Sequence, residues 1–473
     1  MTQTNTYTNP ILPGSHPDPS IIRSGENYFL ITSSFEYFPG IPIYHSTDLI
    51  SWNLISHALT RRSQLDIRTP EPGGGIWAPT IREHEGWFYI TALFFDDDGK
   101  VYLSTTRRKH ERTPGRSLKD FAIHITTIDI NTGFSTSIPK VIRSSESGIA
   151  EGSHIFKRGK FYYLFTAEGG TESGHCDEVV NTGHIDIVED KNGNWWAVML
   201  ACRPIRLAEG TKILPSAHGE YEKIPGGWKS SVFVINNGKK ITLQGEGPGT
   251  YQFQQLSKWR DDFTSPDLQL GWYRKNTPQK RDYEISTNPP SLHLRGSPYK
   301  LNSPACPTLL LRKQTSRLGL WSTKLSFAPT SPHMEAGTAV YWNHSTHLRL
   351  GIWSSAADTR KRIVAFHHEI NGQNARSGSR ELEIEGDVIL LIGCTDEGYI
   401  LGYRACAGGD AREIEWMCEA TVDEIMGEPA IGAAFTGMML GVYASGNGDS
   451  GTVPARFEFV EFDTLWKIDG VGR

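Results

Sequence analysis

Two carboxylate residues lie in sequence surroundings that could support acid–base chemistry. Asp18 lies between two prolines in GSHPDPS, residues 14–20, directly before the hydrophobic strand start IIRS. The prolines restrict the backbone on both sides of the aspartate, which suits a base that must hold one geometry. Glu151 lies in GIAEGSHIFKRGKFYYLF, before a glycine and at the entry to an aromatic strand. Taken singly, the first residue is also typical of an Asp-Pro turn and the second of a surface loop.

Two carboxyl groups at the entrances of different strand pairs could converge on one cleft. Inverting glycoside hydrolysis uses such a pair, a protonated acid and an ionised base about 6.5–9.5 Å apart. Trp77 in GGGIWAP, and Phe35 and Phe38 in SSFEYFPGIPIYHS, lie in loops rich in Gly and Pro. Aromatic residues in such loops can stack on sugar faces, although packing between sheets explains them equally well.

Three further polar residues are candidates for the same cleft. His184 and Asp186 lie in NTGHIDIVEDKNGNWW, and Arg203 lies in ACRPI. A lone histidine is more often a core residue than a metal ligand. The arginine could simply pair with a carboxylate, so these residues alone decide nothing.

Five glycine turns, each followed by an aromatic-rich strand, predict five β-hairpins in the first ~240 residues. The turns are centred on Gly25, Gly86, Gly99, Gly159 and Gly193. Such a repeat is typical of a β-propeller, with an irregular sandwich as the alternative. The first two turns are 61 residues apart and the third and fourth are 60 apart, but only 13 residues separate the second from the third. A four-stranded blade needs about 40–50 residues, so these 13 residues cannot hold one.

The second half of the chain has a different pattern. After GEGPGT, residues 245–250, which reads as a linker, polar and apolar residues alternate in the segments 321–329, 337–343, 347–353 and 455–462. Period-two alternation with turn-rich joints predicts an antiparallel β-sandwich. We therefore expect an all-β chain of two domains, with residues 1–248 and 255–473.

Composition excludes several classes of function. The net charge is −5 and no Lys/Arg-rich run is present, which argues against a nucleic-acid partner. No stretch of about 18 apolar residues predicts a membrane span, and the N-terminus has no secretory signal pattern, so we expect a cytoplasmic location. The six cysteines lack CxxC spacing and are expected to be free thiols. The oligomeric state is left open.

The motifs together, in this order, resemble glycoside hydrolase family 43 of the β-xylosidase and α-L-arabinofuranosidase type. The resemblance rests on NPILPGSHPDPSIIR, GGIWAPTI, EGSHIFKRGKFYYLFTAEGGT, TGHIDIVEDKNGNWWAVM and RPI, and DDFTSPDLQLGWY is similar to the start of the family's second domain. It implies a five-bladed β-propeller followed by a concanavalin A-like β-sandwich. It also implies an inverting enzyme that removes xylose or arabinofuranose from the ends of xylo-oligosaccharides or arabinose-containing oligosaccharides.

The resemblance also implies roles for single residues. Asp18 would be the general base and Glu151 the general acid. Phe35, Trp77, Arg203 and His184 would contact the sugar. No cofactor is required, but some members hold a central cation near the position of His184, so a structural calcium is a further expectation.

One departure from the family pattern concerns catalysis. The family has a third carboxylate in a D-P-S-L-F-F type run, where this chain has Ile90, Thr91 and Ala92 before LFFDDDG. That carboxylate tunes the acid's pKa, and Asp96, Asp97 and Asp98 read as solvated turn residues that do not replace it. We expect propeller segments to be missing near residues 90–93 and 175–181, with weak activity. The alternative is a catalytically inactive carbohydrate-binding protein.

Overall fold

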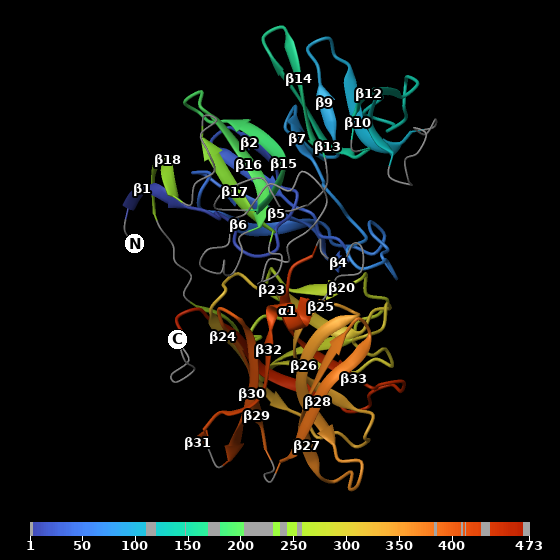
Figure 1. Ribbon diagram of the computed structural model, residues 1–473, viewed down its shortest axis with the longest axis vertical. Helices are drawn as coiled ribbons and strands as arrows, with labels where there is room; N and C mark the ends of the chain where they lie inside the picture. The colour runs from blue at the N-terminus through green and yellow to red at the C-terminus, as the bar shows by residue number, and fades with distance from the viewer. Residues whose placement is uncertain are drawn as a thin grey trace.

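The protein is almost entirely β-structure. The computed structural model describes residues 3–109, 120–146, 148–168, 180–202, 230–236, 244–252, 258–382, 386–407, 410–411, 413–426 and 436–466 (Figure 1). These residues contain 34 strands and one short helix, α1 (Val422–Met426). The expected all-β fold class is confirmed.

Among the described residues the first half forms six small antiparallel sheets, five of which follow one another along the chain. The first contains β2 (Ser20–Ser24), β3 (Asn27–Ile31), β5 (Gly40–Ser46) and β6 (Asn53–Leu59). The next two contain β7 (Ile81–His84) with β8 (Trp87–Ile90), and then β9 (Leu93–Phe95), β10 (Val101–Arg108), β11 (Phe121–Ile128) and β12 (Lys140–Ser144). The last two contain β13 (Ala150–Arg158) with β14 (Phe161–Glu168), and then β15 (Val180–Glu189), β16 (Trp195–Cys202) and β17 (Ser230–Asn236). Among the described residues, the β7–β8 and β13–β14 sheets have two strands each.

All five predicted hairpins are present. The turns join β2 to β3, β7 to β8, β9 to β10, β13 to β14 and β15 to β16. Each turn glycine has a positive φ, between 59° and 80°, which an L-residue adopts only with strain. The glycines are therefore what identified the hairpins in the sequence. The number of propeller blades stays a prediction.

The segment expected to be a linker is instead a strand. Residues 244–252 form β18 (Gln244–Gln252), which pairs antiparallel with β1 (Gln3–Thr8). The linker prediction at residues 245–250 is therefore wrong. Gly and Pro weaken a strand in the middle of a sheet, but Pro is tolerated in an edge strand, and β18 pairs with one strand among the described residues.

The second half consists of two large sheets, as expected for a sandwich. The nine-stranded sheet holds β19 (Lys258–Asp261), β21 (Tyr283–Thr287), β22 (Pro290–Leu294), β24 (Gly319–Ser326), β29 (Val388–Cys394), β30 (Gly398–Ala407), β31 (Asp410–Ala411), β32 (Glu415–Thr421) and β34 (Ala455–Asp463). The eight-stranded sheet holds β20 (Tyr273–Lys275), β23 (Thr308–Lys313), β25 (Glu335–Asn343), β26 (Thr346–Ser354), β27 (Arg362–Ile370), β28 (Gln373–Glu381), β33 (Met439–Ser445) and, from the first half, β4 (Tyr37–Phe38). The four alternating segments of the sequence lie in β24, β25, β26 and β34, which confirms them.

A continuous apolar core fills the space between these two sheets. Trp321, Trp342, Leu350 and Leu390 are all less than 2% exposed within it. Burying side chains of this size stabilises the fold by about 1.5–3 kcal/mol each. The described cysteines, Cys306, Cys394, Cys406 and Cys418, are free thiols, as expected.

Strand β4 connects the first half directly to the sandwich. Arg274 and Lys275 of β20 pair with Phe38 and Tyr37. Tyr37 is 6% exposed and its hydroxyl donates a hydrogen bond to the Trp342 carbonyl over 3.1 Å. The loop that carries Phe35 is thereby anchored to the second domain. Phe38 takes part in this contact through its backbone, and its place in the expected aromatic platform stays a prediction.

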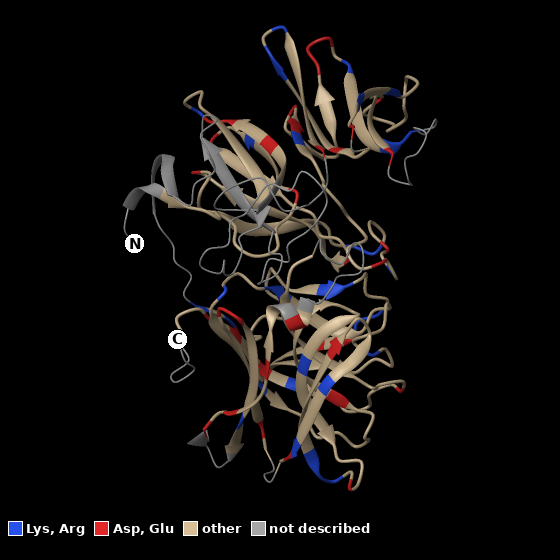
Figure 2. Cartoon of the chain, in the orientation of Figure 1, with Lys and Arg blue, Asp and Glu red and all other residues tan. Residues whose placement is uncertain are grey.

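Charged residues of both signs are distributed over both halves of the chain (Figure 2). This distribution agrees with the absence of a basic run in the sequence. Within the described residues, no helix is long and apolar enough to span a bilayer.

Candidate active site

The carboxylate of Asp18 is held in one position at the entry of β2. Its backbone has φ = +54°, a strained conformation for a non-glycine residue. The Ser33 hydroxyl donates to Asp18 Oδ2 over 2.5 Å and accepts from the Ala78 amide over 2.6 Å. The Ser33 amide in turn donates to the Pro17 carbonyl over 3.0 Å. The Asp18 side chain is still 19% exposed, so a fixed carboxylate remains open to solvent.

His184 lies between Asp18 and the segment that carries Glu151. Its Nδ1 is 3.9 Å from Asp18 Oδ1, and the residue is 6% exposed. A Cβ atom on Gly152 would lie 2.6 Å from the same Nδ1, so only glycine allows this approach. Glu151, directly before this glycine, is the second residue of β13 and is partly exposed. The structure therefore brings Asp18, His184 and the Glu151–Gly152 step together.

A buried charged cluster lies behind His184. Arg82 Nη1 is 3.1 Å from Asp186 Oδ2, and Arg82 Nη2 donates to His154 Nδ1 over 3.1 Å. The His154 and His184 rings meet edge to face, with centroids 5.2 Å apart. Because Arg82 occupies Nδ1 of His154, the proton of the neutral imidazole belongs on its Nε2.

The charge of this cluster is fixed over the ordinary pH range. Burial raises the pKa of Asp186, but the positive charge of Arg82, the neighbouring His154 and the Ser20 hydroxyl lower it further, to about 2. Burial lowers the pKa of His154 to about 3. The cluster therefore consists of one arginine cation, one carboxylate and a neutral histidine.

Two of the expected aromatic residues lie side by side near Asp18. The Phe35 and Trp77 rings are 6.4 Å apart in an edge-to-face arrangement. Paired backbone bonds between Phe35 and Ile76 hold the two loops together, and Gly75 leaves the space for them. Trp77 is 54% exposed and Phe35 only 5% exposed. Trp77 therefore offers an accessible stacking face, while Phe35 supports it from below.

Comparison with known proteins agrees with this site and fold. The sequence pattern described as "Glycosyl hydrolases family 43" matches residues 7–92 and 91–181, and "Beta xylosidase C-terminal Concanavalin A-like domain" matches residues 260–463. A xylosidase/arabinosidase of Butyrivibrio fibrisolvens is 30% identical over 515 positions, covering 93% of this chain and 96% of that protein. This chain belongs to glycosyl hydrolase family 43.

Other members of the family are similar over nearly the whole chain. A non-reducing end α-L-arabinofuranosidase of Bacteroides ovatus is 28% identical, covering 97% of this chain and 95% of that protein. The solved xylan β-1,4-xylosidase of Bacillus halodurans has a TM-score of 0.82 at 25% identity, covering 97% of this chain and all of that one. The solved family 43 protein of the Bacteroides ovatus xyloglucan locus has a TM-score of 0.80 at 26% identity, with the same coverage.

The family match is divided where the sequence predicts a lost segment. The two matched pieces meet at residues 91–92. In the structure, Thr91 and Ala92 alone join β8 to β9, which belong to different sheets. The alignment with the arabinofuranosidase spans 530 positions, whereas 97% of 473 residues is about 459, so roughly 70 positions of that relative have no counterpart. The junction supplies no carboxylate at Ile90, Thr91 or Ala92.

Asp96, the nearest carboxylate after this junction, is bound elsewhere. Lys157 Nζ lies 2.5 Å from Asp96 Oδ1, and the Tyr162 hydroxyl donates to Asp96 Oδ2 over 2.8 Å. These contacts leave its side chain 8% exposed, so the expectation of a solvated residue is wrong for Asp96. It joins the β9–β10 turn to the β13–β14 hairpin.

The remaining expectations concern Arg203 and calcium. Arg203 lies outside the described residues. His184 Nε2 is buried and has no hydrogen-bond partner among the described residues, but no group of three His, Cys, Asp or Glu in that part of the chain could hold a metal. Calcium prefers six to eight oxygen ligands, which a single imidazole does not provide. The described residues therefore do not fit a calcium cage, and calcium stays a prediction.

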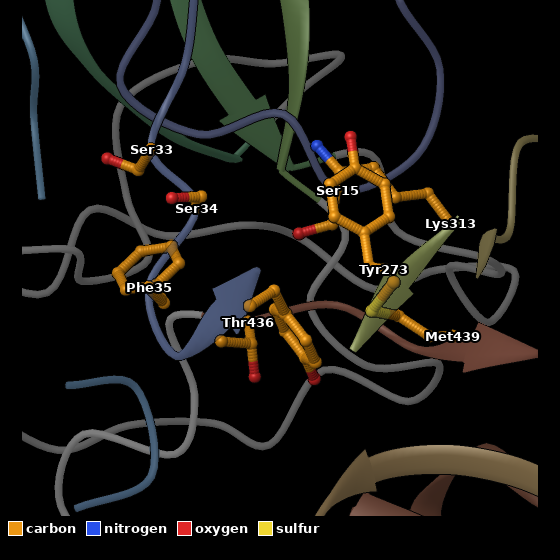
Figure 3. A pocket seen from close by; sticks show the side chains of 9 residues that line it. Ser15, Ser33, Ser34, Phe35, Tyr273, Lys313, Thr436 and Met439 are labelled. Atoms are coloured by element: carbon orange, nitrogen blue, oxygen red, sulfur yellow. The ribbon is translucent and has the colours of Figure 1, made fainter. Parts of the chain in front are cut away.

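A small cavity lies behind the Asp18 site, at the contact with the sandwich. Figure 3 shows Ser33, Ser34 and Phe35 on one side and Tyr273, Lys313 and Met439 of the second domain on the other. Lys313 Nζ is buried without a hydrogen-bond partner among the described residues, and burial lowers its pKa to about 7. Ser33, which orients Asp18, thus lines a cavity that the sandwich also lines.

Ser33, Arg82 and His154 were missed by the sequence reasoning. Arg82 directly follows the motif GGIWAPTI and His154 lies within EGSHIF, but nothing local distinguishes them from solvent-facing strand residues. A buried arginine needs a partner, and the partner of Arg82 is 104 residues away.

Proposed function

We propose that this chain is an inverting, exo-acting glycosidase that releases xylose or arabinofuranose from oligosaccharides, with weakened activity. The observation that carries the proposal is the carboxylate of Asp18, which is held in place, is open to solvent and faces His184. The Glu151–Gly152 step lies close to the same histidine. The names of the relatives supply the two sugars. Residues 1–248 would form a five-bladed propeller and residues 255–473 the sandwich.

In this proposal the two carboxyl groups act on opposite sides of the glycosidic bond. Asp18, ionised, removes a proton from a water molecule as that water attacks the anomeric carbon. Glu151, protonated, gives its proton to the departing oxygen. Trp77 stacks on the sugar, and His184 positions Asp18 relative to Glu151. Such general-acid assistance contributes about 10²–10⁴-fold in rate.

The absent third carboxylate explains why we propose weak turnover. One unit of pKa corresponds to about 1.4 kcal/mol of difference between the protonated and ionised states of an acid. Without a neighbouring negative charge, Glu151 loses its proton more easily and is less often ready to donate it. Substrates that need no acid assistance should therefore be affected least.

Aryl glycosides test the proposal and separate the two carboxylates. With 4-nitrophenyl β-xyloside and α-arabinofuranoside, Asp18→Ala and Glu151→Ala should both abolish turnover. With 2,4-dinitrophenyl β-xyloside, whose leaving group needs no proton, Glu151→Ala should keep most of the activity and Asp18→Ala should not. Asp98→Ala, a carboxylate in an exposed turn, is the matched control. Equal losses for all three variants would contradict the assigned roles.

The absent carboxylate also favours a second candidate, a carbohydrate-binding protein without turnover. Trp77 would then act only as a platform. Calorimetric binding of xylo-oligosaccharides, abolished by Trp77→Ala, together with no release from either dinitrophenyl glycoside would support this candidate. Turnover sensitive to Asp18→Ala would exclude it.

A further inference from the structure

Strand β14 presents a run of three exposed aromatic residues beside an unpaired strand edge. Phe161, Tyr162 and Tyr163 are 58%, 55% and 46% exposed. Among the described residues, β14 pairs with β13 alone. Figure 1 shows the β13–β14 hairpin projecting from the first half of the chain. A free edge of this kind is a template for pairing with another strand.

The register of the hairpin shows which backbone groups face outward. Arg158 pairs with Phe161, so only two residues, Gly159 and Lys160, form the turn. In a two-residue hairpin the two residues that flank the turn exchange both backbone hydrogen bonds. The N–H and C=O groups of successive residues then point alternately toward the paired strand and away from it. The N–H and C=O groups of Phe161 therefore face β13, and those of Tyr162, Leu164 and Thr166 face the free edge.

This edge is complementary to itself in an antiparallel arrangement. If two copies pair around Leu164, Tyr162 lies opposite the partner's Thr166 and Leu164 opposite the partner's Leu164. The outward-facing N–H and C=O groups of one copy then lie opposite those of the other copy, which gives about six backbone hydrogen bonds. Residues 161–167 carry no charge, and at each end Lys160 lies opposite the partner's Glu168, whose carboxylate is also paired with Arg143 of its own chain over 2.6 Å.

Several strands lie at a sheet edge among the described residues, and two of those in the first half, β8 and β12, suit self-pairing less well. Strand β8 has only four residues and offers few hydrogen bonds. Strand β12 pairs with β11 alone, and it carries Lys140 and Arg143 but no acidic residue. Pairing two copies of β12 would bring positively charged side chains of both copies into one strand pair, although Arg143 is itself paired with Glu168. Charge on an edge strand is a common way in which proteins protect it.

We propose that two copies of this chain associate through β14 as an antiparallel strand pair with two-fold symmetry. The contact is isologous, so the same patch serves both copies and the assembly closes at a dimer. The two hairpins become one four-stranded sheet, and Tyr163 gains the partner's Phe165 as its cross-strand neighbour. The proposal does not depend on the enzymatic activity.

Charge exchange tests the pairing register. Light scattering and sedimentation should show a dimer for the unmodified chain. Lys160→Glu and Glu168→Lys each create two like-charge contacts, so each variant should dimerise about tenfold or more weakly. Because Glu168→Lys also breaks the ion pair with Arg143 inside the chain, recovery of the dimer in a mixture is the decisive result. An equimolar mixture of the two restores both opposite-charge contacts and should recover the dimer. Lys280→Glu, an exposed residue of the sandwich, is the matched control and should behave as the unmodified chain. A monomeric unmodified chain, or a mixture no better than its components, would overturn the proposal.

A proline substitution tests the backbone contribution separately. The Leu164 amide faces outward, so Leu164→Pro leaves the hairpin intact and removes the central hydrogen bonds of the dimer. We expect a monomer with an unchanged circular dichroism spectrum and unfolding temperature. A Leu164→Pro dimer as tight as the original would show that copies associate elsewhere.

Discussion

Two buried arginine clusters, one in each half of the molecule, can be compared directly. In the first half, Arg82 lies 3.1 Å from Asp186, which is fully buried. In the sandwich, Arg349 lies 2.7 Å from Glu369 and 3.5 Å from Glu335, which is 1% exposed. Each cluster also contains a buried histidine. The sandwich cluster holds one more carboxylate than the first, and burial, together with the negative charge of Glu369, raises the pKa of Glu335.

The clusters differ in how well their carboxylates are hydrogen-bonded. Asp186 also accepts from the Ser20 hydroxyl over 2.5 Å and from the Ile21 amide over 3.0 Å, and its pKa is lowered to about 2 even though burial raises it. Burial raises the pKa of Glu335, and Arg349 does not reverse this. An arginine alone does not compensate a buried carboxylate for lost water; additional donors must do so. The well-satisfied cluster is the one beneath His184.

Removing the carboxylate of the first cluster should have the largest effect. Asp186→Ala leaves the Arg82 cation buried without its anion, which costs about 3–5 kcal/mol of unfolding free energy. Urea denaturation measures the loss, and hydrogen exchange should locate it in β2, β7 and β15. Asp396→Ala, which removes an exposed pair with Arg317, is the control and should cost less than about 1 kcal/mol. Equal losses would mean that the cluster is not electrostatically special.

Removing the arginine of the second cluster should cost less. Arg349→Met leaves Glu335 and Glu369 buried, but Glu335 can take up a proton because its pKa is already raised. Glu369 also keeps its hydrogen bond from Asn302, over 2.8 Å. We expect a loss of about 2–3 kcal/mol at pH 7, shrinking as the pH falls toward 4.5. A loss as large as that of Asp186→Ala would remove the distinction between the clusters.

The sequence did not show how the two clusters differ in the hydrogen bonding of their carboxylates, but it did show the hairpins and short motifs near the first cluster. Gly25, Gly86 and Gly159 identified hairpins because a positive φ at a turn is a local requirement. Asp18 and Trp77 were found because their motifs are short and continuous. Arg82 is held by a residue 104 positions away, and no local pattern encodes that contact.

The errors have the same origin. Residues 245–250 contain Gly and Pro and look like a linker, but pairing with β1 makes them a strand. Asp96 lies in a turn of three aspartates, yet Lys157 from another sheet removes it from solvent. In both cases a long-range partner overrode the local preference.

Acidification should destabilise the cluster beneath His184 through His154. Burial lowers the pKa of His154 to about 3, whereas the unfolded chain has the ordinary value of about 6.5. The unfolded state therefore binds a proton first, and stability is full above pH 6.5 and falls as the pH drops toward 3. Between pH 6.5 and 5 the loss is about 2 kcal/mol. In His154→Gln, this part of the pH dependence should disappear in urea denaturation.

His347, the buried histidine of the sandwich cluster, allows the same pH dependence to be measured there. Burial, together with Arg349, lowers the pKa of His347 to about 3 as well. His347→Gln should therefore flatten the pH curve by a similar amount. If the unfolding free energy of His154→Gln depends on pH as that of the unmodified protein does, while that of His347→Gln does not, His154 is not neutral and buried as described.

Replacing the poorly satisfied carboxylate should have the smallest effect, with the opposite sign. Burial raises the pKa of Glu335 in the folded protein, so ionising this carboxyl group costs stability as the pH rises through that pKa. Glu335→Gln removes that cost, and we expect the protein to be unchanged or up to about 1 kcal/mol more stable at pH 7, with no gain at pH 4. Glu369→Gln is the matched control, because the pKa of Glu369 is lowered: burial raises it, but His347 and Arg349 outweigh burial. That variant should lose stability at pH 7. A clear loss in Glu335→Gln would show that Arg349 stabilises both carboxylates, as Arg82 does Asp186.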